Sequence, residues 1–380
     1  MQNPVSRRFG PWMSAFAWAC LVAPVVSFGA DYGKPGEPIK LVVGYQPYYT
    51  ESWSGAILNA KQFWKKYLPA GSTVEFQVGL QGAVIVNAMT GEKQHIGYVG
   101  DMPGIVSTFR NLPDRGATDI RIVGTLGTSK QQCNIFIVRN DAPQFANGRE
   151  AVKWMAGKVT ASPHGSCTDR FARLAFKSAG IEPQSYLNQN IEVITTNFRA
   201  GKLDAAVVWE PTASKIVQSG LARRVASGED FDALDGGFLI MLGDLIKQRP
   251  DVYKGWLEAE LDAQLFMLDP NNAEEISKML EKQTEQVDRK ALWASLYGEN
   301  PANIGGGAVK VQLDYIVSER VQKLIAEATE FLHGLPNKPA AAPKIRDGGV
   351  DDSMAREVLS ARKLTSPLGV VGARPMSEYK

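Results

Sequence analysis

Cysteine and histidine are scarce in this sequence, which has three residues of each among 380. A structural zinc site normally takes about four ligands, mostly from these two residue types. Small scaffolds held together by disulfides are much richer in cysteine. We therefore expect neither a metal site nor a disulfide-dense fold.

Neither sign of charge predominates. The chain has 42 Lys and Arg against 40 Asp and Glu, and two of the basic residues, Arg7 and Arg8, lie in the N-terminal leader described below. Proteins that bind nucleic acid present a strongly basic face. The balance of charge predicts no nucleic-acid partner.

Long apolar runs are absent apart from residues 12–26, which are too few to span a membrane. This run follows Arg7 and Arg8, precedes the small residues Ser27 and Gly29, and has no acid before Asp31. The pattern is that of a cleaved signal peptide, here residues 1–29, and predicts export to the periplasm. The arginine pair leaves both the general secretory and the twin-arginine route open. The remaining chain, about 350 residues, is enough for two lobes with proper cores.

Two cysteines follow the leader, Cys133 and Cys167. An even pair in an exported protein favours a disulfide. Two reduced, buried thiols are the alternative.

Alternating strand and helix patterns run through the chain and predict an α/β fold. We expect strands at 41–45, 73–78, 95–100, 120–123, 134–138, 157–161, 191–195, 205–209 and 236–241. We expect helices at 54–68, 83–90, 168–179, 211–219, 250–268, 273–286, 309–333 and 351–362, with a helical turn at 197–201.

The order of these elements predicts two lobes. Residues 30–130 and 237–333 form the first lobe, and residues 131–236 form the second. The chain crosses between them near 128–132 and 235–238. Residues 334–380 form a C-terminal extension that begins with a linker rich in proline and alanine. The predicted fold is a clamshell whose cleft lies at the carboxyl ends of two parallel sheets, where ligands bind in open α/β folds.

The segment 204–211, Asp-Ala-Ala-Val-Val-Trp-Glu-Pro, is the most informative part of the sequence. It is a short apolar strand that ends at Trp209 and Glu210, with Pro211 suited to open a helix. The strand therefore places an aromatic and an acid at the expected cleft. The alternative is a core tryptophan beside a helix cap.

Several motifs together resemble periplasmic substrate-binding proteins of the taurine, alkanesulfonate and nitrate ABC importers. They occur in family order at 43–46 (Val-Gly-Tyr-Gln), 82–88, 95–103, 157–158, 204–211, 249–252 and 261–264. The resemblance implies a type II clamshell without catalysis or cofactor. It also implies a monomer that delivers a small anion or zwitterion to a membrane permease with its ATPase. The sequence departs from the family in a longer loop at 47–53, in Glu210, which only some relatives have, and in the tail after residue 334.

An anion needs fixed hydrogen-bond donors, which helix N-termini supply. Loops that supply them here contain Gln81 and Gly82, Asp101 and Met102, and 165–168. Hydroxyl groups of Thr128, Ser129, Ser166 and Thr168 add neutral donors. Helix capping by Ser166 or Thr168 is the alternative role, and it is compatible with binding.

Relatives that bind taurine carry an acid in the loop that matches 47–53, so the resemblance implies that Glu51 pairs with a ligand amine. A solvent-facing glutamate is the alternative. Aromatic residues near the same loop predict a wall for a ligand larger than nitrate, unless some of them belong to the core: Tyr45, Tyr48, Tyr49, Trp53 and Trp209. The predicted ligand-binding set also includes Gln46, His164, Cys167, Asn197 and Glu210.

Two other functions stay open. Within the binding proteins, nitrate, bicarbonate and aromatic carboxylates compete with sulfonates as ligands. From a different class, His164 and Cys167 are spaced like a nucleophilic pair of an exported cysteine-dependent enzyme, although no third, orienting group is evident.

Overall fold

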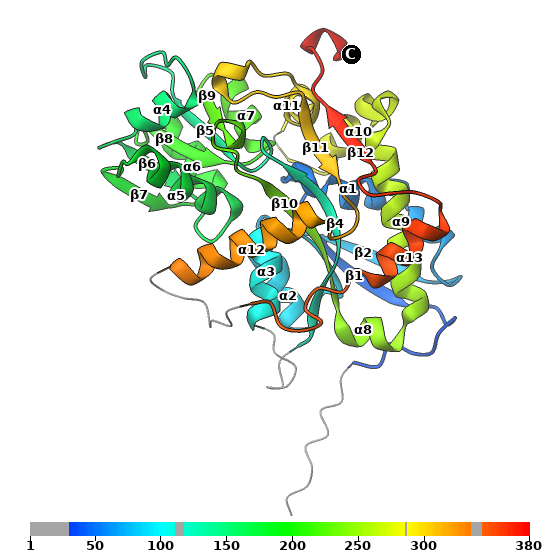
Figure 1. Cartoon of the computed structure of the whole chain (residues 1–380). Helices are drawn as coiled ribbons and strands as arrows, with labels where there is room; N and C mark the ends of the chain where they lie inside the picture. The colour runs from blue at the N-terminus through cyan, green and yellow to red at the C-terminus, as the bar shows by residue number, and fades with distance from the viewer. Residues whose placement is uncertain (1–29, 111–117, 286, 336–343) are drawn as a thin grey trace, which may run out of the picture. The chain divides into compact units, whose positions relative to one another are not determined.

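Two β-sheets organise the computed structural model (Figure 1). The structure describes residues 30–110, 118–285, 287–335 and 344–380, and Tyr32–Lys380 form one unit. The expected signal peptide and the proline-rich stretch 336–343 lie outside the described residues. Each sheet carries helices on its faces, and the result is the two-lobed α/β clamshell that the sequence predicts.

The first lobe contains the larger sheet, in which β1 pairs in parallel with β2 and β3, while β10 runs antiparallel to β3 and β4. Its strand order is β12 (Gly369–Gly372), β11 (Val309–Leu313), β4 (Ile120–Ser129), β10 (Asp235–Leu242), β3 (Ile96–Gly100), β1 (Lys40–Tyr45) and β2 (Thr73–Val78). Its helices are α1 (Trp53–Lys61), α2 (Gly82–Thr90), α3 (Asp101–Arg110), α8 (Gly243–Gln248), α9 (Pro250–Leu268), α10 (Ala273–Glu281), α11 (Arg289–Tyr297), α12 (Glu319–Gly334) and α13 (Ser353–Ala361). Its short 3-10 helices are η1 (Thr50–Ser52), η2 (Phe63–Lys66), η5 (Pro270–Asn272) and η7 (Met376–Glu378), whereas η6 (Ala302–Ile304) packs against the second lobe.

The second lobe contains the smaller sheet, with strand order β7 (Ser185–Asn188), β6 (Val159–Ser162), β8 (Ala205–Val208), β5 (Ile135–Arg139) and β9 (Ala222–Ser227). Its helices are α4 (Gly148–Trp154), α5 (Cys167–Ala179), α6 (Ile191–Arg199) and α7 (Thr212–Gln218), with η4 (Gly228–Phe231). Both faces of its central strands are buried. Alternate residues of β5 and β8 enter two separate apolar clusters, because side chains of a strand point to opposite faces.

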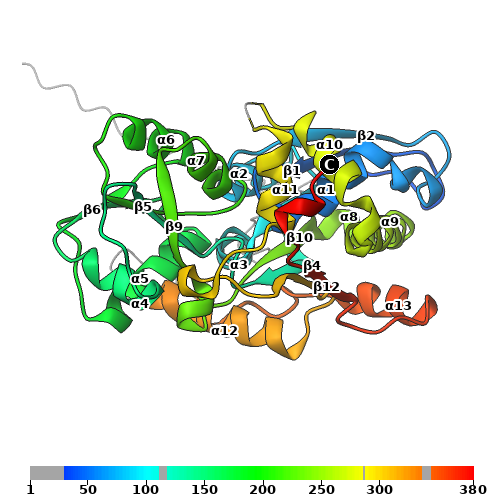
Figure 2. The ribbon, with the colours of Figure 1, turned by 90° about the horizontal axis from the view of Figure 1, so that it is seen from above.

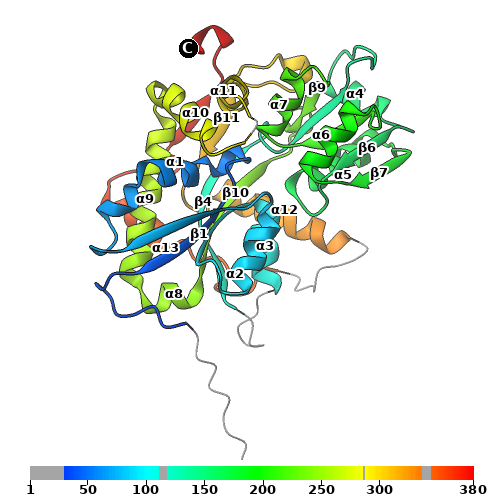
Figure 3. The same cartoon turned by 180° about the vertical axis from the view of Figure 1, so that it is seen from behind.

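Two strands connect the lobes. The outgoing strand β4 pairs with the returning strand β10, from Ser129 opposite Asp235 to Ile120 opposite Leu242. Seen from above, the helices α4, α5, α6 and α7 lie on the side of the second lobe, and α1, α8 and α9 lie on the opposite side (Figure 2). From behind, α2 and α3 are seen to pack against each other beside β1 (Figure 3).

Two predicted elements are wrong. Residues 191–195 are not a strand but the start of α6. Their β-branched side chains favour a strand, yet Asn190 caps a helix by accepting from the Val193 N–H, and Ile191, Ile194 and Phe198 bury one helical face. The strands β7, β9 and β12 and the helices α3, α4, α8 and α11 were missed.

The predicted helix 309–333 is also wrong in its first part. Residues Val309–Leu313 form β11, which pairs with β12, and α12 begins only after Ser318 accepts a hydrogen bond from the Val321 N–H. The tail therefore adds an edge strand to the first sheet, and its helix α13 packs on α9.

Candidate functional site

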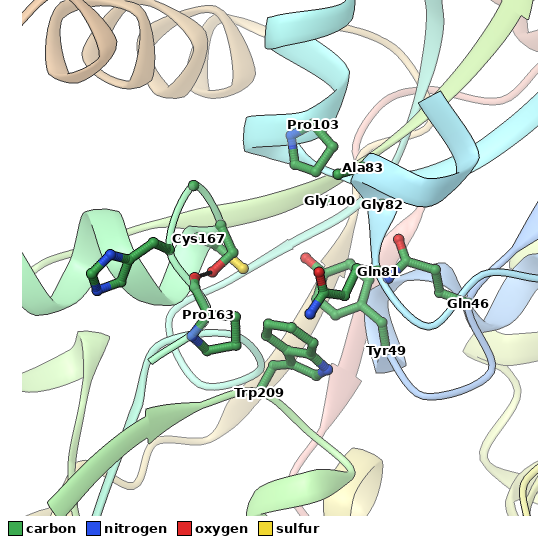
Figure 4. A pocket seen from close by; sticks show the side chains of 13 residues that line it. Gln46, Tyr49, Gln81, Gly82, Ala83, Gly100, Pro103, Pro163, Cys167 and Trp209 are labelled. Carbon is green, nitrogen blue, oxygen red and sulfur yellow. Dashed lines mark hydrogen bonds between the residues drawn. The ribbon is translucent and has the colours of Figure 1, made fainter. Parts of the chain in front are cut away.

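A small cavity lies where the carboxyl ends of strands from both lobes meet. Residues after β1 and β2 and at the end of β3 line it from the first lobe, and residues after β6 and β8 line it from the second. Its volume is about 50 Å³. Figure 4 shows Pro163, Cys167 and Trp209 on one side and Gln46, Tyr49 and Gln81 on the other. The lining residues are Gln46, Tyr49, Gln81, Gly82, Ala83, Gly100, Pro103, Pro163, His164, Gly165, Ser166, Cys167 and Trp209.

Two helices begin at the cavity, α2 at Gly82 and α5 at Cys167. Neither has a described side chain that caps it. In particular, the Ser166 hydroxyl bonds to the Pro163 carbonyl and to the Thr168 hydroxyl instead. The first backbone N–H groups of both helices therefore keep their hydrogen-bonding capacity, and each helix dipole adds partial positive charge. This arrangement suits an anion.

Apolar side chains from both lobes join beside the cavity. Tyr49 of the first lobe packs in one cluster with Ile191, Trp209 and the two cysteines of the second lobe and its crossing segment. Cys133 and Cys167 form a disulfide, with 6.0 Å between their Cα atoms. The bond attaches the start of α5 to the crossing segment.

No lysine, arginine, aspartate or glutamate is among the described residues that line the cavity. His164 is the histidine at its edge. Burial lowers the pKa of His164, its ring packs on Tyr186 with 4.6 Å between centroids, and its Nε2 has no partner among the described residues. We therefore expect a neutral imidazole at physiological pH.

The acids nearest the cavity are buried behind its wall. Asp101 is fully buried and pairs with Arg170 of α5, with 2.7 Å between the charged atoms. Glu51 is also buried, at 1% exposure, and accepts a hydrogen bond from the Tyr49 hydroxyl. Burial, followed by repulsion from Asp235, raises the pKa of Glu51 well above its usual value.

The structure brings part of the predicted site together. The predicted residues that line the cavity are Gln46, Tyr49, Gln81, Gly82, His164, Ser166, Cys167 and Trp209. Glu51 does not line it, because the ring of Tyr49 stands at the wall while Glu51 meets only its hydroxyl. Glu51 is not the solvent-facing glutamate of the alternative either.

Other predicted residues lie elsewhere for identifiable reasons. Trp53 is fully buried in the first lobe, and Tyr48 faces a separate groove against α6. Thr128 and Ser129 donate hydrogen bonds to Asp314 and to the Lys310 carbonyl on the far side of the crossing strands.

The remaining predicted residues serve the fold around the cavity. Asn197 of α6 donates to the side chain of Gln189, which precedes that helix, and Glu210 accepts from Ser214 in the first turn of α7. Asp101, Met102 and Thr168 are buried at the starts of α3 and α5 and do not line the cavity.

Sequence reasoning missed Gly100, Pro103 and Pro163 as lining residues. They carry no chemical signal of their own, although Gly100 and Pro103 flank the Asp101 that was singled out. Among the described residues, no group of three or more His, Cys, Asp or Glu side chains is placed to hold a metal ion. No described helix is both long and apolar enough to cross a membrane.

Comparison with known proteins places the chain among proteins of this fold. It is 22% identical over 339 residues to the taurine-binding periplasmic protein of Escherichia coli (strain K12). The alignment covers 87% of this chain and 93% of that protein. The alkanesulfonate-binding protein of Xanthomonas axonopodis pv. citri, solved with MOPS, matches with a TM-score of 0.63 at 19% identity over 84% of this chain and 99% of that one.

The nitrate-binding protein of Synechocystis PCC 6803 matches with a TM-score of 0.65 at 18% identity, over 87% of this chain and 90% of that one. At these identities, the two structural matches show the fold. The NMT1-like family model matches residues 34–281, more than half of the chain, and the protein therefore belongs to the NMT1-like family.

Proposed function

We propose that this protein is the periplasmic substrate-binding component of an ABC importer and that it captures a small organic anion between its lobes. The observation that carries the proposal is the pair of uncapped helix N-termini, α2 and α5, that face one cavity from opposite lobes. An anion held by both would bridge the lobes and stabilise the closed clamshell. Delivery to a permease with its ATPase follows from that role.

The cavity favours a short sulfonate without an amine. Its 50 Å³ is room for roughly three to five water-sized groups, because about 10–15 Å³ holds one. Tyr49 and Trp209 offer apolar faces for a short alkyl group. A taurine amine would need a carboxylate partner, and no described acid lines the cavity. We therefore place an alkanesulfonate such as ethanesulfonate ahead of taurine, and nitrate or bicarbonate after both.

A binding screen tests the proposal. We expect ethanesulfonate to raise the unfolding temperature of residues 30–380, since a ligand at 100 times its Kd stabilises by about 2.7 kcal/mol. Taurine, nitrate, bicarbonate and an aromatic carboxylate are the competitors, and calorimetry ranks their affinities. If none of these compounds binds, the proposal is wrong.

A negative charge placed at the start of α2 tests whether the ligand binds in this cavity. Ala83 is exposed at the start of α2 and lines the cavity. Ala83→Glu is compatible with the helix because an acid is favourable in its first turn, yet it repels an anion there. We expect this variant to lose binding. Asn87→Glu, one turn further along the same helix and outside the cavity lining, is the matched control and should bind normally.

The exported cysteine-dependent enzyme remains a second function to test. Cys167 is joined to Cys133, and a disulfide sulfur is not a free thiolate nucleophile. Turnover of an ester or thioester by the unreduced protein would support the enzyme instead.

A further inference from the structure

Two carboxyl groups meet behind the cavity wall, that of Glu51 on η1 and that of Asp235 at the first position of β10. Their side chains lie within hydrogen-bonding reach of each other, and Glu51 Oε1 and Asp235 Oδ1 have no donor among the described residues. An ionised carboxylate oxygen can only accept hydrogen bonds. Two carboxyl groups can therefore bond to each other only when one of them carries a proton. The contact therefore implies one protonated carboxyl.

The surroundings of the pair favour that proton. Both residues are buried, with exposures of 1% for Glu51 and 0% for Asp235. The charged groups that face them are Asp101 at the start of α3 and Arg170 on α5, and these two pair with each other. Arg170 thus lies near three acids, which are Asp101, Glu51 and Asp235. Burial raises the pKa of Asp235 to about 7 and raises the pKa of Glu51 well above its usual value. Their contact lowers the pKa of Asp235 and raises that of Glu51, so the last proton of the pair stays on Glu51.

The pair is connected to the cavity on one side and to the crossing segment on the other. The remaining oxygen of Glu51 accepts from the Tyr49 hydroxyl, which also lies 3.1 Å from the Gly236 carbonyl. The remaining oxygen of Asp235 accepts from the Cys133 N–H at 2.8 Å. Tyr49 lines the cavity, and Cys133 is bonded to Cys167 at the opposite wall.

We propose that Glu51 and Asp235 share one proton and that this pair positions Tyr49 at the cavity, which makes both acids positioning residues for the ligand. Loss of the proton leaves two buried negative charges in contact. Their repulsion displaces η1 from the start of β10, and Tyr49 moves with it. The effect on ligand affinity rests on the proposed function, whereas the shared proton and its effect on Tyr49 do not.

The ligand-free protein tests the proton directly. We expect the carbon-13 signal of the Tyr49 ring, identified by its absence in Tyr49→Phe, to shift at a pH above the Asp235 pKa of about 7, as Glu51 loses the last proton of the pair. In Glu51→Gln the amide N–H donates to Asp235 in place of the proton, so the signal should stay constant. Asp235→Asn provides the same test from the other side and serves if the first variant fails to fold. A Tyr49 signal that is constant in the wild type, or that titrates equally in both variants, overturns the proposal.

Calorimetry with ethanesulfonate then tests positioning. Across the pH range in which the Tyr49 signal shifts, we expect wild-type affinity to fall as the shared proton is lost. The fall should be roughly two- to twelvefold, the range for one net hydrogen bond. Glu51→Gln should keep the tighter affinity throughout that range, and Glu182→Gln, an exposed control, should behave as the wild type. Equal pH dependence in the wild type and Glu51→Gln contradicts positioning. Absence of any ethanesulfonate binding contradicts the proposed function instead, and the Tyr49 signal still decides the proton.

Discussion

Trp209, which follows β8 in the second lobe, donates its indole N–H to the Tyr48 carbonyl of the first lobe at 2.9 Å. Next to it, the Thr50 N–H donates to the Glu210 carbonyl at 3.3 Å. These bonds hold the loop after β1 against the end of β8, beside the cavity. The segment 204–211 thus joins the two lobes through Trp209 and Glu210, and its Trp209 also lines the cavity between them.

Trp209→Phe keeps an aromatic wall and removes the N–H that bridges the lobes. We expect the ligand-free variant to populate more open conformations and to show a larger radius of gyration in small-angle scattering than the wild type. A saturating ligand should reduce the radius of both proteins to the same value. Trp154→Phe on α4, remote from the cavity, is the control. An unchanged radius in Trp209→Phe would show that this bond does not hold the lobes together.

The Asp101–Arg170 pair connects α3 of the first lobe with α5 of the second, and its side chains are 0% and 6% exposed. Arg170→Met leaves Asp101 buried without its cation, which typically costs about 3–5 kcal/mol of unfolding free energy. Adding Asp101→Asn should restore much of that loss. Urea unfolding measures both.

Arg173→Met is the matched control on the same helix. Arg173 is 39% exposed, and its partner Asp169 is buried. Asp169 also accepts from the Gly165 N–H and the Tyr186 hydroxyl, so it keeps donors without Arg173 and we expect a smaller loss than for Arg170→Met. Equal losses in Arg170→Met and Arg173→Met would contradict a special role for the buried pair.

The disulfide between Cys133 and Cys167 closes a loop with a sequence separation of 34. We expect no free thiol in denatured, unreduced protein from which the leader has been removed. Cys133→Ser combined with Cys167→Ser should lower the unfolding free energy by about 2–4 kcal/mol, the usual range for such a bond. Reductant should lower the stability of the wild type but not that of the double variant. Two titratable thiols in the wild type would refute the bond.

Part of the strand and helix order was predictable from the sequence, where the signals were local. The buried strands 41–45 and 205–209 and the helix 250–268 are marked by apolar runs, periodicity and Pro250, and the structure has β1, β8 and α9 there. The β-branched run from Ile191 misled the prediction, since a cap at Asn190 and burial against the second sheet determine its helix.

The candidate site was predictable only where backbone groups form it, at the starts of helices. The starts of α2 and α5 follow from strand ends and helix signals, and they line the cavity as expected. The direction of the Glu51 side chain depends on its contact with Asp235. Asp235 is 184 positions away in the chain, so no local sequence pattern could predict that contact. The hydroxyls of Thr128 and Ser129 likewise donate to distant partners, the Asp314 carboxylate and the Lys310 carbonyl of β11.

Lys310 of β11 predicts how stability depends on pH. It is fully buried, its ammonium donates to the Gly298 carbonyl at 3.0 Å, and its charged neighbours are Arg224 and Glu210. Burial, followed by repulsion from Arg224, lowers the pKa of Lys310 from 10.5 to about 7. Between these two values the unfolded chain binds a proton that the folded protein does not. Stability therefore rises with pH across this range.

Lys310→Met isolates that contribution, because the thioether side chain fills similar space and does not titrate. We expect the unfolding free energy of the wild type to rise relative to the variant by about 1 kcal/mol per pH unit between about pH 7.5 and about pH 9.5. Urea unfolding at several pH values in this range measures it. Lys323→Met, at an exposed position, should show no such difference from the wild type. Parallel pH profiles for the wild type and Lys310→Met would mean that the buried amine is protonated in the folded protein and that Glu210 compensates its charge.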